Sequence, residues 1–236
     1  MNKLFFSWPQ KNRALPVICV CVGQVIWGFS YLFTRIAQSS ASPTVVLSMR
    51  FLASWVIMTA LIWSGKKSFS LKGKNFRPLL ALALLEPPYY FFESYGVYYS
   101  NATFAGTVMA FAPVVGILAA MLFLGEKPTR RQKIFSLLPT AGVIIITSVG
   151  SSMGIVKPLG AIFLFASQIV AAGMKLYNKK SSEEFSSFER TYAIVVANAI
   201  IFTIKSMIDL HGDVRAYAAP LGNPEYVFAL VVLCLF

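Results

Sequence analysis

The chain has 236 residues, of which 57% are hydrophobic and only 13% are charged, and its mean hydropathy is +0.67. Soluble domains carry about 25% charged residues, so the composition argues against a soluble globule and excludes both intrinsic disorder and a collagen-like repeat. The net charge of +12 at pH 7 does not by itself indicate nucleic acid, because in a membrane protein the position of the charges decides their meaning.

Apolar segments of about 20 residues, the length of a helix that crosses a bilayer, follow one another along the chain. They run over 15–36, 44–64, 78–99, 103–124, 134–150, 158–177 and 190–208, and an eighth begins near 225. Barrel strands are about 10 residues long and alternate in polarity, so these segments predict helices. The sequence therefore predicts an all-α polytopic membrane protein with seven to eight transmembrane helices in the lipid bilayer.

The basic residues are distributed unevenly between the two sides of this predicted bundle. Sixteen of the 21 lie in the N-terminal arm or in the connections after the second, fourth and sixth spans. The opposite connections contain four basic residues, which are Arg35, Lys157, Lys205 and Arg215. Because Lys and Arg accumulate in cytoplasmic loops, the pattern predicts a cytoplasmic N-terminus. The basic clusters then orient the chain and face lipid headgroups, and we expect no nucleic acid partner.

Few residues are suited to metal or disulfide chemistry. The three cysteines, Cys19, Cys21 and Cys234, lie in apolar runs and form no disulfide framework. The single histidine, His211, stands between Asp209 and Asp213 in a predicted external connection. This is a weak metal motif that is more typical of a solvated loop, so we expect no metal site, no cofactor and no catalytic residue. It is also the feature on which an alternative function, a membrane-embedded enzyme that modifies lipids, would depend.

Three ionisable residues lie inside predicted spans, where a charge costs roughly 2.5–3.5 kcal/mol and is therefore a functional candidate. Arg50 and Glu93 are expected at similar depth below the outer surface. Two interpretations are open: they form a structural ion pair, or Glu93 binds a substrate amine or a proton while Arg50 binds a carboxylate. Glu86, near the midplane, has no obvious partner and is a candidate proton-coupling site.

Other candidates for the substrate pathway come from helical spacing. Gln24, Trp27 and Tyr31 share one face of the first span, and Gln168 begins a similar stripe in the sixth. Pro87-Pro88 removes two amide donors and predicts a break in the third span, of the kind found beside substrate cavities. Among the aromatic residues that follow it, Tyr90 is a candidate wall of such a cavity.

An internal repeat is suggested by two pairs of basic residues. Arg35 and Arg50 stand 15 residues apart, as do Lys175 and Arg190, with an offset of 140 between the pairs. An odd number of spans separates the two pairs, so a repeated unit would be inverted, as in many secondary transporters. The interpretation is a five-helix repeat over 1–150 and an incomplete second repeat over 151–236. Such a ten-helix plan predicts that the sequence is truncated after part of its eighth span.

Several motifs resemble one family. Trp27-Gly28 lies in the first span, Ala112-Pro113 in the fourth, and Gly125-Glu126-Lys127-Pro128-Thr129 follows it. The chain resembles the EamA-type branch of the drug/metabolite transporter superfamily, most clearly over residues 15–150.

That resemblance implies a secondary-active transporter of the bacterial inner membrane, with inverted five-helix repeats around a central cavity. By alternating access it would move a small-molecule substrate, such as an amino acid or a related amphiphilic compound, usually outward. A homodimer is one candidate assembly. The alternatives left open are the lipid-modifying enzyme and an inactive transporter fragment.

Overall fold

The computed structural model describes residues 14–124, 128–132 and 157–235, together with the single residues 134, 136, 138 and 141. In chain order the helices are α1 (Ala14–Ala37), α2 (Pro43–Trp63), α3 (Arg77–Tyr99), α4 (Ala102–Met109), α5 (Ala112–Leu124), α7 (Pro158–Ser181), α8 (Ser187–Asp209), α9 (Val214–Ala218), the 3-10 turn η1 (Ala219–Gly222) and α10 (Pro224–Leu235). Within this described part α2, α7 and α8 are long and apolar enough to cross a membrane. The predicted all-α polytopic architecture is confirmed, whereas most of the predicted span 134–150 lies outside the described residues.

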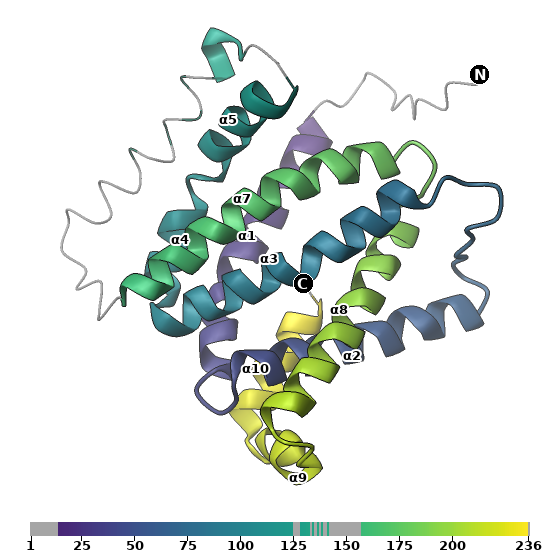
Figure 1. The fold of residues 1–236 in the computed structure, drawn as a ribbon, viewed down its shortest axis with the longest axis vertical. Coiled ribbons are helices and arrows are strands. Elements are labelled where there is room, and N and C mark those ends of the chain that lie inside the picture. Colours follow the sequence, from purple (N-terminus) through teal and green to yellow (C-terminus); the bar gives the residue numbers. More distant parts are fainter. Residues whose placement is uncertain are drawn as a thin grey trace.

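The helices pack in pairs around α3 (Figure 1). The most extensive packing joins α3 to α7. Helix α8 packs against α2 and α3, and α10 packs against α1 and α2. The connections 64–76 and 182–186 lie side by side, and we call this the basic end of the bundle (Figure 1). Connection 38–42 lies at the other end beside 210–223, where the Asn223 amide donates to Ser40 Oγ at 2.8 Å.

Prolines break the fourth predicted span and leave the third intact, the reverse of the expectation from sequence. The predicted span 103–124 is two helices, α4 and α5, which are separated by Ala110 and Phe111. Pro113 occupies the second position of α5, where its missing amide hydrogen is not needed. The predicted break at Pro87-Pro88 is wrong, because α3 continues through both prolines. Packing of α3 against α2, α7 and α8 supplies the stability that the two missing hydrogen bonds do not.

Two helix pairs have matching dimensions. Helices α1 and α7 are both 24 residues long, and each is followed by a five-residue connection, 38–42 or 182–186. Each connection ends in a serine N-cap, Ser42 before α2 and Ser186 before α8. The match agrees with a repeat, which itself stays a prediction.

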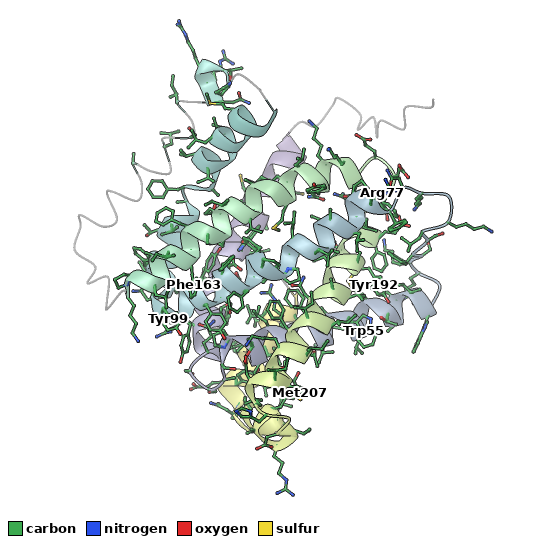
Figure 2. All side chains as sticks on the ribbon, viewed as in Figure 1. Trp55, Arg77, Tyr99, Phe163, Tyr192 and Met207 are labelled. Carbon is green, nitrogen blue, oxygen red and sulfur yellow. The ribbon has the colours of Figure 1, made fainter. Side chains whose placement is uncertain are left out.

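Small residues allow α3 and α7 to approach closely. A Cβ atom on Gly160 of α7 would lie 3.0 Å from the backbone carbon of Tyr99 and 3.1 Å from the Ser100 nitrogen. The backbone amide of Lys157 donates to the Tyr99 carbonyl at 3.1 Å, which fixes this approach. The rings of Tyr99 and Phe163 lie against each other across the same contact, with centroids 6.1 Å apart (Figure 2). Backbone rather than a flexible side chain therefore limits the space at Gly160.

We expect Gly160→Ala to lower the free energy of unfolding by about 1–3 kcal/mol, because the added methyl group forces two backbones apart. Gly173→Ala on the same helix is the matched control, since its Cβ would lie 3.7 Å from Leu85 Cδ1 in ordinary contact. Thermal unfolding of both purified variants in detergent measures the difference. Equal midpoints for the two variants would contradict the close approach of α3 and α7.

Candidate functional site

A buried carboxylate joins α1 to α3. Glu93 is 8% exposed, and its Oε1 accepts hydrogen bonds from two tyrosine hydroxyls, Tyr31 at 2.9 Å and Tyr89 at 2.6 Å. Tyr89 lies one helical turn before Glu93 on α3, whereas Tyr31 reaches it from α1. Both donors converge on one oxygen, so the carboxylate is oriented by residues of two helices.

Glu93 faces a cavity of about 170 Å³ between α1, α2 and α3, which we call the Glu93 cavity. Its lining is Gly23, Ile26, Trp27, Ser30, Tyr31, Thr34, Leu47, Arg50, Tyr90, Glu93, Ser94 and Val97. Hydroxyl, carboxylate and guanidinium groups thus share a small space with aliphatic and aromatic walls. This combination of apolar walls and a few convergent polar groups is typical of small-molecule sites.

Arg50 lines the Glu93 cavity without pairing with Glu93. In the described part of the chain the salt bridges join Lys74 to Glu189 and Lys205 to Asp209. The half-buried guanidinium of Arg50 instead lies over aromatic rings, with its central carbon 5.7 Å from the centroids of both Phe51 and Tyr90. The interpretation of Arg50 and Glu93 as a structural ion pair is therefore wrong in this structure. Tyrosine hydroxyls satisfy the carboxylate, and aromatic faces hold the guanidinium.

Glu86 lies in a second cavity, of about 360 Å³, between α2, α3, α8 and the end of α10. We call it the Glu86 cavity. Glu86 is 8% exposed and has no hydrogen-bond partner among the residues that the structure describes. Arg50 and Tyr90 line this cavity as well as the Glu93 cavity. The two predicted intramembrane carboxylates therefore lie in different cavities that share part of one wall.

Gln168 lies in a third cavity, of about 350 Å³, between α1, α4 and α7. Gln24, Trp27 and Tyr31 from the α1 stripe line it as well, and the Gln168 amide contacts the sulfur of Met109. Trp27 and Tyr31 also line the Glu93 cavity, so they separate the two spaces. The structure thus brings all eight candidate pathway residues to three adjoining cavities. Their role in transport stays a prediction.

The aspartates of the weak metal motif have structural partners. Asp209 forms an ion pair with Lys205 and accepts a hydrogen bond from Thr44 at 3.1 Å. Asp213 caps α9 by accepting from the amides of Arg215 and Ala216. The stretch from Asp209 to Asp213 is thus a helix end and a helix start, which account for both carboxylates.

A polar contact at the basic end was missed by the sequence analysis. Glu189 on α8 accepts from the Lys74 ammonium at 2.6 Å and from the Ser70 amide at 3.2 Å, both in the α2–α3 connection. It also accepts from the Ser186 amide at 2.8 Å, while the Ser186 side chain caps the helix in return. The Lys74 ammonium lies 4.8 Å from the centroid of the Phe185 ring.

We call these five residues the basic-end clamp. The spacing Ser-x-x-Glu before an apolar run is a helix-capping signature, so the sequence did hold a signal for Glu189 as a cap. That signature identifies Glu189 as a helix cap but does not indicate a partner in another segment. The contact with Lys74 could therefore not be predicted from it.

A bundle of apolar helices with charged residues buried in its interior defines a multi-pass membrane protein. The model of the EamA-like transporter family matches residues 14–148, which is more than half of the chain. The chain belongs to this family and is a membrane transporter, and the resemblance seen in the sequence motifs is confirmed.

Relatives of the chain agree with this assignment. The uncharacterized transporter YcxC of Bacillus subtilis is 30% identical over 228 residues, which cover 94% of this chain and 73% of the relative. An uncharacterized transporter of Archaeoglobus fulgidus is 22% identical over 202 residues, or 84% of this chain and 71% of the relative. The uncharacterized inner membrane transporter YedA of Escherichia coli K12 is 25% identical over 185 residues, or 78% and 59%.

We expect Glu189→Gln to loosen the basic-end clamp, because a carboxamide offers one acceptor oxygen where the carboxylate offers two. One donor of these part-buried hydrogen bonds then loses its acceptor, and the free energy of unfolding falls by about 1–3 kcal/mol. Hydrogen–deuterium exchange of residues 64–76 should rise in parallel. Glu183→Gln in the exposed part of the neighbouring connection is the control. Unchanged exchange in Glu189→Gln would show that the clamp does not hold the connection.

Proposed function

We propose that the protein is a secondary-active transporter that exports a small amphiphilic metabolite, such as an amino acid, across the bacterial inner membrane. The observation that carries the proposal is the Glu93 cavity. Inside a helical bundle it combines an oriented carboxylate with an arginine that pairs with no acidic side chain of the described residues. Charged groups in a bilayer are expensive and mark substrate or ion pathways by default. The direction of export comes from the family resemblance.

Alternating access is the mechanism that this arrangement supports best. The matched dimensions of α1–α2 and α7–α8 support an inverted repeat, and rocking of one repeat against the other is the usual way such transporters work. The basic-end clamp joins the α2–α3 connection to the α7–α8 connection and would close one end of the pathway. Polar contacts of this kind can exchange with water when the end opens, so they suit a gate better than apolar packing does.

The distribution of charge supports a cytoplasmic basic end. The connections and helix ends there contain Lys66, Lys67, Lys72, Lys74, Arg77, Lys179, Lys180 and Arg190. The other end has only four basic residues in the described part of the chain: Arg35, Lys157, Lys205 and Arg215. With the excess of Lys and Arg inside, the N-terminus is cytoplasmic as well.

A lipid-modifying enzyme is the weaker candidate. Its acidic and histidine motif would have to supply a metal or a nucleophile at the membrane surface. The carboxylates of Asp209 and Asp213 are instead occupied by an ion pair, a hydroxyl and a helix cap. No comparable observation favours turnover at that end, so transport is the function that we propose.

Flux in proteoliposomes tests the proposal. A mixed pool of labelled amino acids and amines is offered to the reconstituted protein, with and without a pH gradient. We expect uptake that falls about tenfold or more, equivalent to about 1.4 kcal/mol, in Glu93→Gln and in Arg50→Gln, because each variant removes a charged group from the Glu93 cavity.

The matched controls are Glu225→Gln and Arg215→Gln, which alter exposed residues outside the three cavities and should leave flux unchanged. Folding of every variant is checked by thermal unfolding. A folded protein that moves no member of the pool would remove the support for an amino acid or amine transporter. Full flux in both cavity variants would place the pathway elsewhere.

Cysteine accessibility tests the orientation. Lys72→Cys at the basic end and Leu221→Cys at the other end are introduced separately after the native cysteines are replaced by serine. Both positions are exposed. We expect a membrane-impermeant maleimide to label Leu221→Cys in intact cells, and Lys72→Cys only after the cells are permeabilised. The opposite pattern would show that the basic end lies outside.

A further inference from the structure

Arg50 and Tyr90 lie at the boundary between two cavities. Both residues line the Glu93 cavity and the Glu86 cavity, and the guanidinium carbon lies 5.7 Å from the centroid of the Tyr90 ring. Phe51 meets Tyr90 edge to face, with the centroids 4.9 Å apart, and so supports the ring in this position. An arginine stacked on an aromatic ring therefore separates the two spaces.

The two cavities lie one after the other along the bundle. The Glu86 cavity includes Met58 on α2 and Thr191 on α8, which lie in the halves of these helices toward the basic end. The Glu93 cavity includes Thr34 on α1 and Val97 on α3, which are close to the other end. A substrate that crosses the bundle through these cavities must pass the boundary formed by Arg50 and Tyr90.

One helix provides a carboxylate on each side of this boundary. Glu86 and Glu93 are seven residues apart on α3, so they project from the same face and are about 10 Å apart along the axis. Glu93 is held by two hydroxyls, whereas Glu86 has no hydrogen-bond partner among the described residues and is more than nine-tenths buried. A buried, unpartnered carboxyl aimed at a cavity is well placed to bind a polar group of a ligand.

The unpaired groups have complementary requirements. A guanidinium without an acidic partner binds a carboxylate in a two-pronged geometry, and a carboxylate binds an ammonium. A purely anionic ligand would leave Glu86 without a partner, and a purely cationic ligand would be repelled by Arg50. A zwitterion such as an α-amino acid satisfies both charges at once and enters with no net charge.

We propose that the Glu86 cavity is a second substrate subsite and that the transported molecule is a zwitterion. Its carboxylate stays on Arg50 while its ammonium group moves between Glu86 and Glu93. The Tyr90 ring is the partition that must turn aside as the molecule passes. This inference rests on the proposed transport function and adds to it the second subsite and the arginine that the two subsites share.

The protein contains a natural reporter for the new subsite. Cys234 on α10 lines the Glu86 cavity, and its thiol lies 3.6 Å from the backbone oxygen of Arg50. When Cys19 and Cys21 are replaced by serine, Cys234 is the only thiol in the sequence. The rate at which neutral methyl methanethiosulfonate modifies this thiol in the reconstituted protein then reports whether the Glu86 cavity is occupied.

Three pools are offered: neutral L-amino acids, their amides, which lack the carboxylate, and the corresponding carboxylic acids, which lack the amine. We expect the amino acid pool at about ten times its Kd to slow modification of Cys234 roughly tenfold, because occupied protein is protected. The amides and the acids should protect far less at the same concentration. Equal protection by all three pools would overturn the assignment of a zwitterion.

Variants assign the protection to the two charges. Glu86→Gln should abolish protection by the amino acid pool, whereas Glu225→Gln, an exposed residue on the same helix as Cys234, should retain it. Should Glu86→Gln fail to fold, Arg50→Lys is the second variant, since it keeps the charge and loses the two-pronged geometry, and it should weaken protection. Full protection in either folded variant overturns the subsite.

Flux measured in the same vesicles distinguishes failure of the second subsite from failure of the transport function. Vesicles that transport amino acids while Cys234 stays unprotected would overturn the second subsite and leave the transport function standing. Vesicles that neither transport nor protect would overturn both.

Discussion

The interaction on which the interior depends is the binding of the Glu93 carboxylate by the hydroxyls of Tyr31 and Tyr89. A carboxyl in the middle of a helical bundle finds its donors in the protein or in a cavity, since lipid offers none. Here one donor comes from α1 and one from α3, so satisfying the carboxyl fixes how the two helices sit against each other. The hydrogen bonds that orient Glu93 in its cavity therefore also fix the packing of α1 on α3.

Polar contacts also join neighbouring segments at both ends of the bundle. At the basic end Glu189 holds the α2–α3 connection through Lys74 and Ser70. At the other end hydroxyl contacts tie α2 to the α8–α10 region: Ser48 lies 2.9 Å from the Thr203 hydroxyl and 2.7 Å from that of Tyr217. Water can replace hydrogen bonds at an aqueous end at low net cost, whereas buried apolar contacts have no such substitute. At the basic end Lys74 is half-buried and Ser70 is exposed, so water can take over their contacts, whereas Ser48 is fully buried.

Helix positions and the alternation of the connections could be predicted from the sequence because hydropathy and charge act locally along the chain. The depth of Arg50 and Glu93 could be estimated in the same way, by counting residues from the ends of their spans. Depth, however, does not say which side chains are neighbours. The hydroxyls of Tyr31 and Tyr89 outcompeted Arg50 for the carboxylate, and that outcome depends on how α1 packs on α3, which no local pattern encodes.

The two proline sites show the same limit at the level of the backbone. Pro87 and Pro88 remove more hydrogen bonds than Pro113 does, yet α3 is continuous and the predicted fourth span is interrupted. The difference lies in the surroundings: α3 is packed against α2, α7 and α8, so leaving the helical path would forfeit more burial than the lost bonds are worth. Propensity pointed to Pro87-Pro88 alone, and tertiary packing kept α3 continuous there, so the predicted break was wrong.

Arg50 links the packing of the interior to the proposed binding of a ligand. A structural arginine in a bilayer would be expected to take the nearest carboxylate, because an ion pair lowers the cost of burying both charges. The fold instead places the tyrosine hydroxyls on Glu93 and rests the guanidinium on Phe51 and Tyr90. Among the described residues Glu86 has no hydrogen-bond partner. Aromatic faces support a cation without neutralising it, so the guanidinium keeps its capacity to bind an anion. An arginine held in this way on the boundary of two cavities supports the proposal that the ligand brings its own carboxylate.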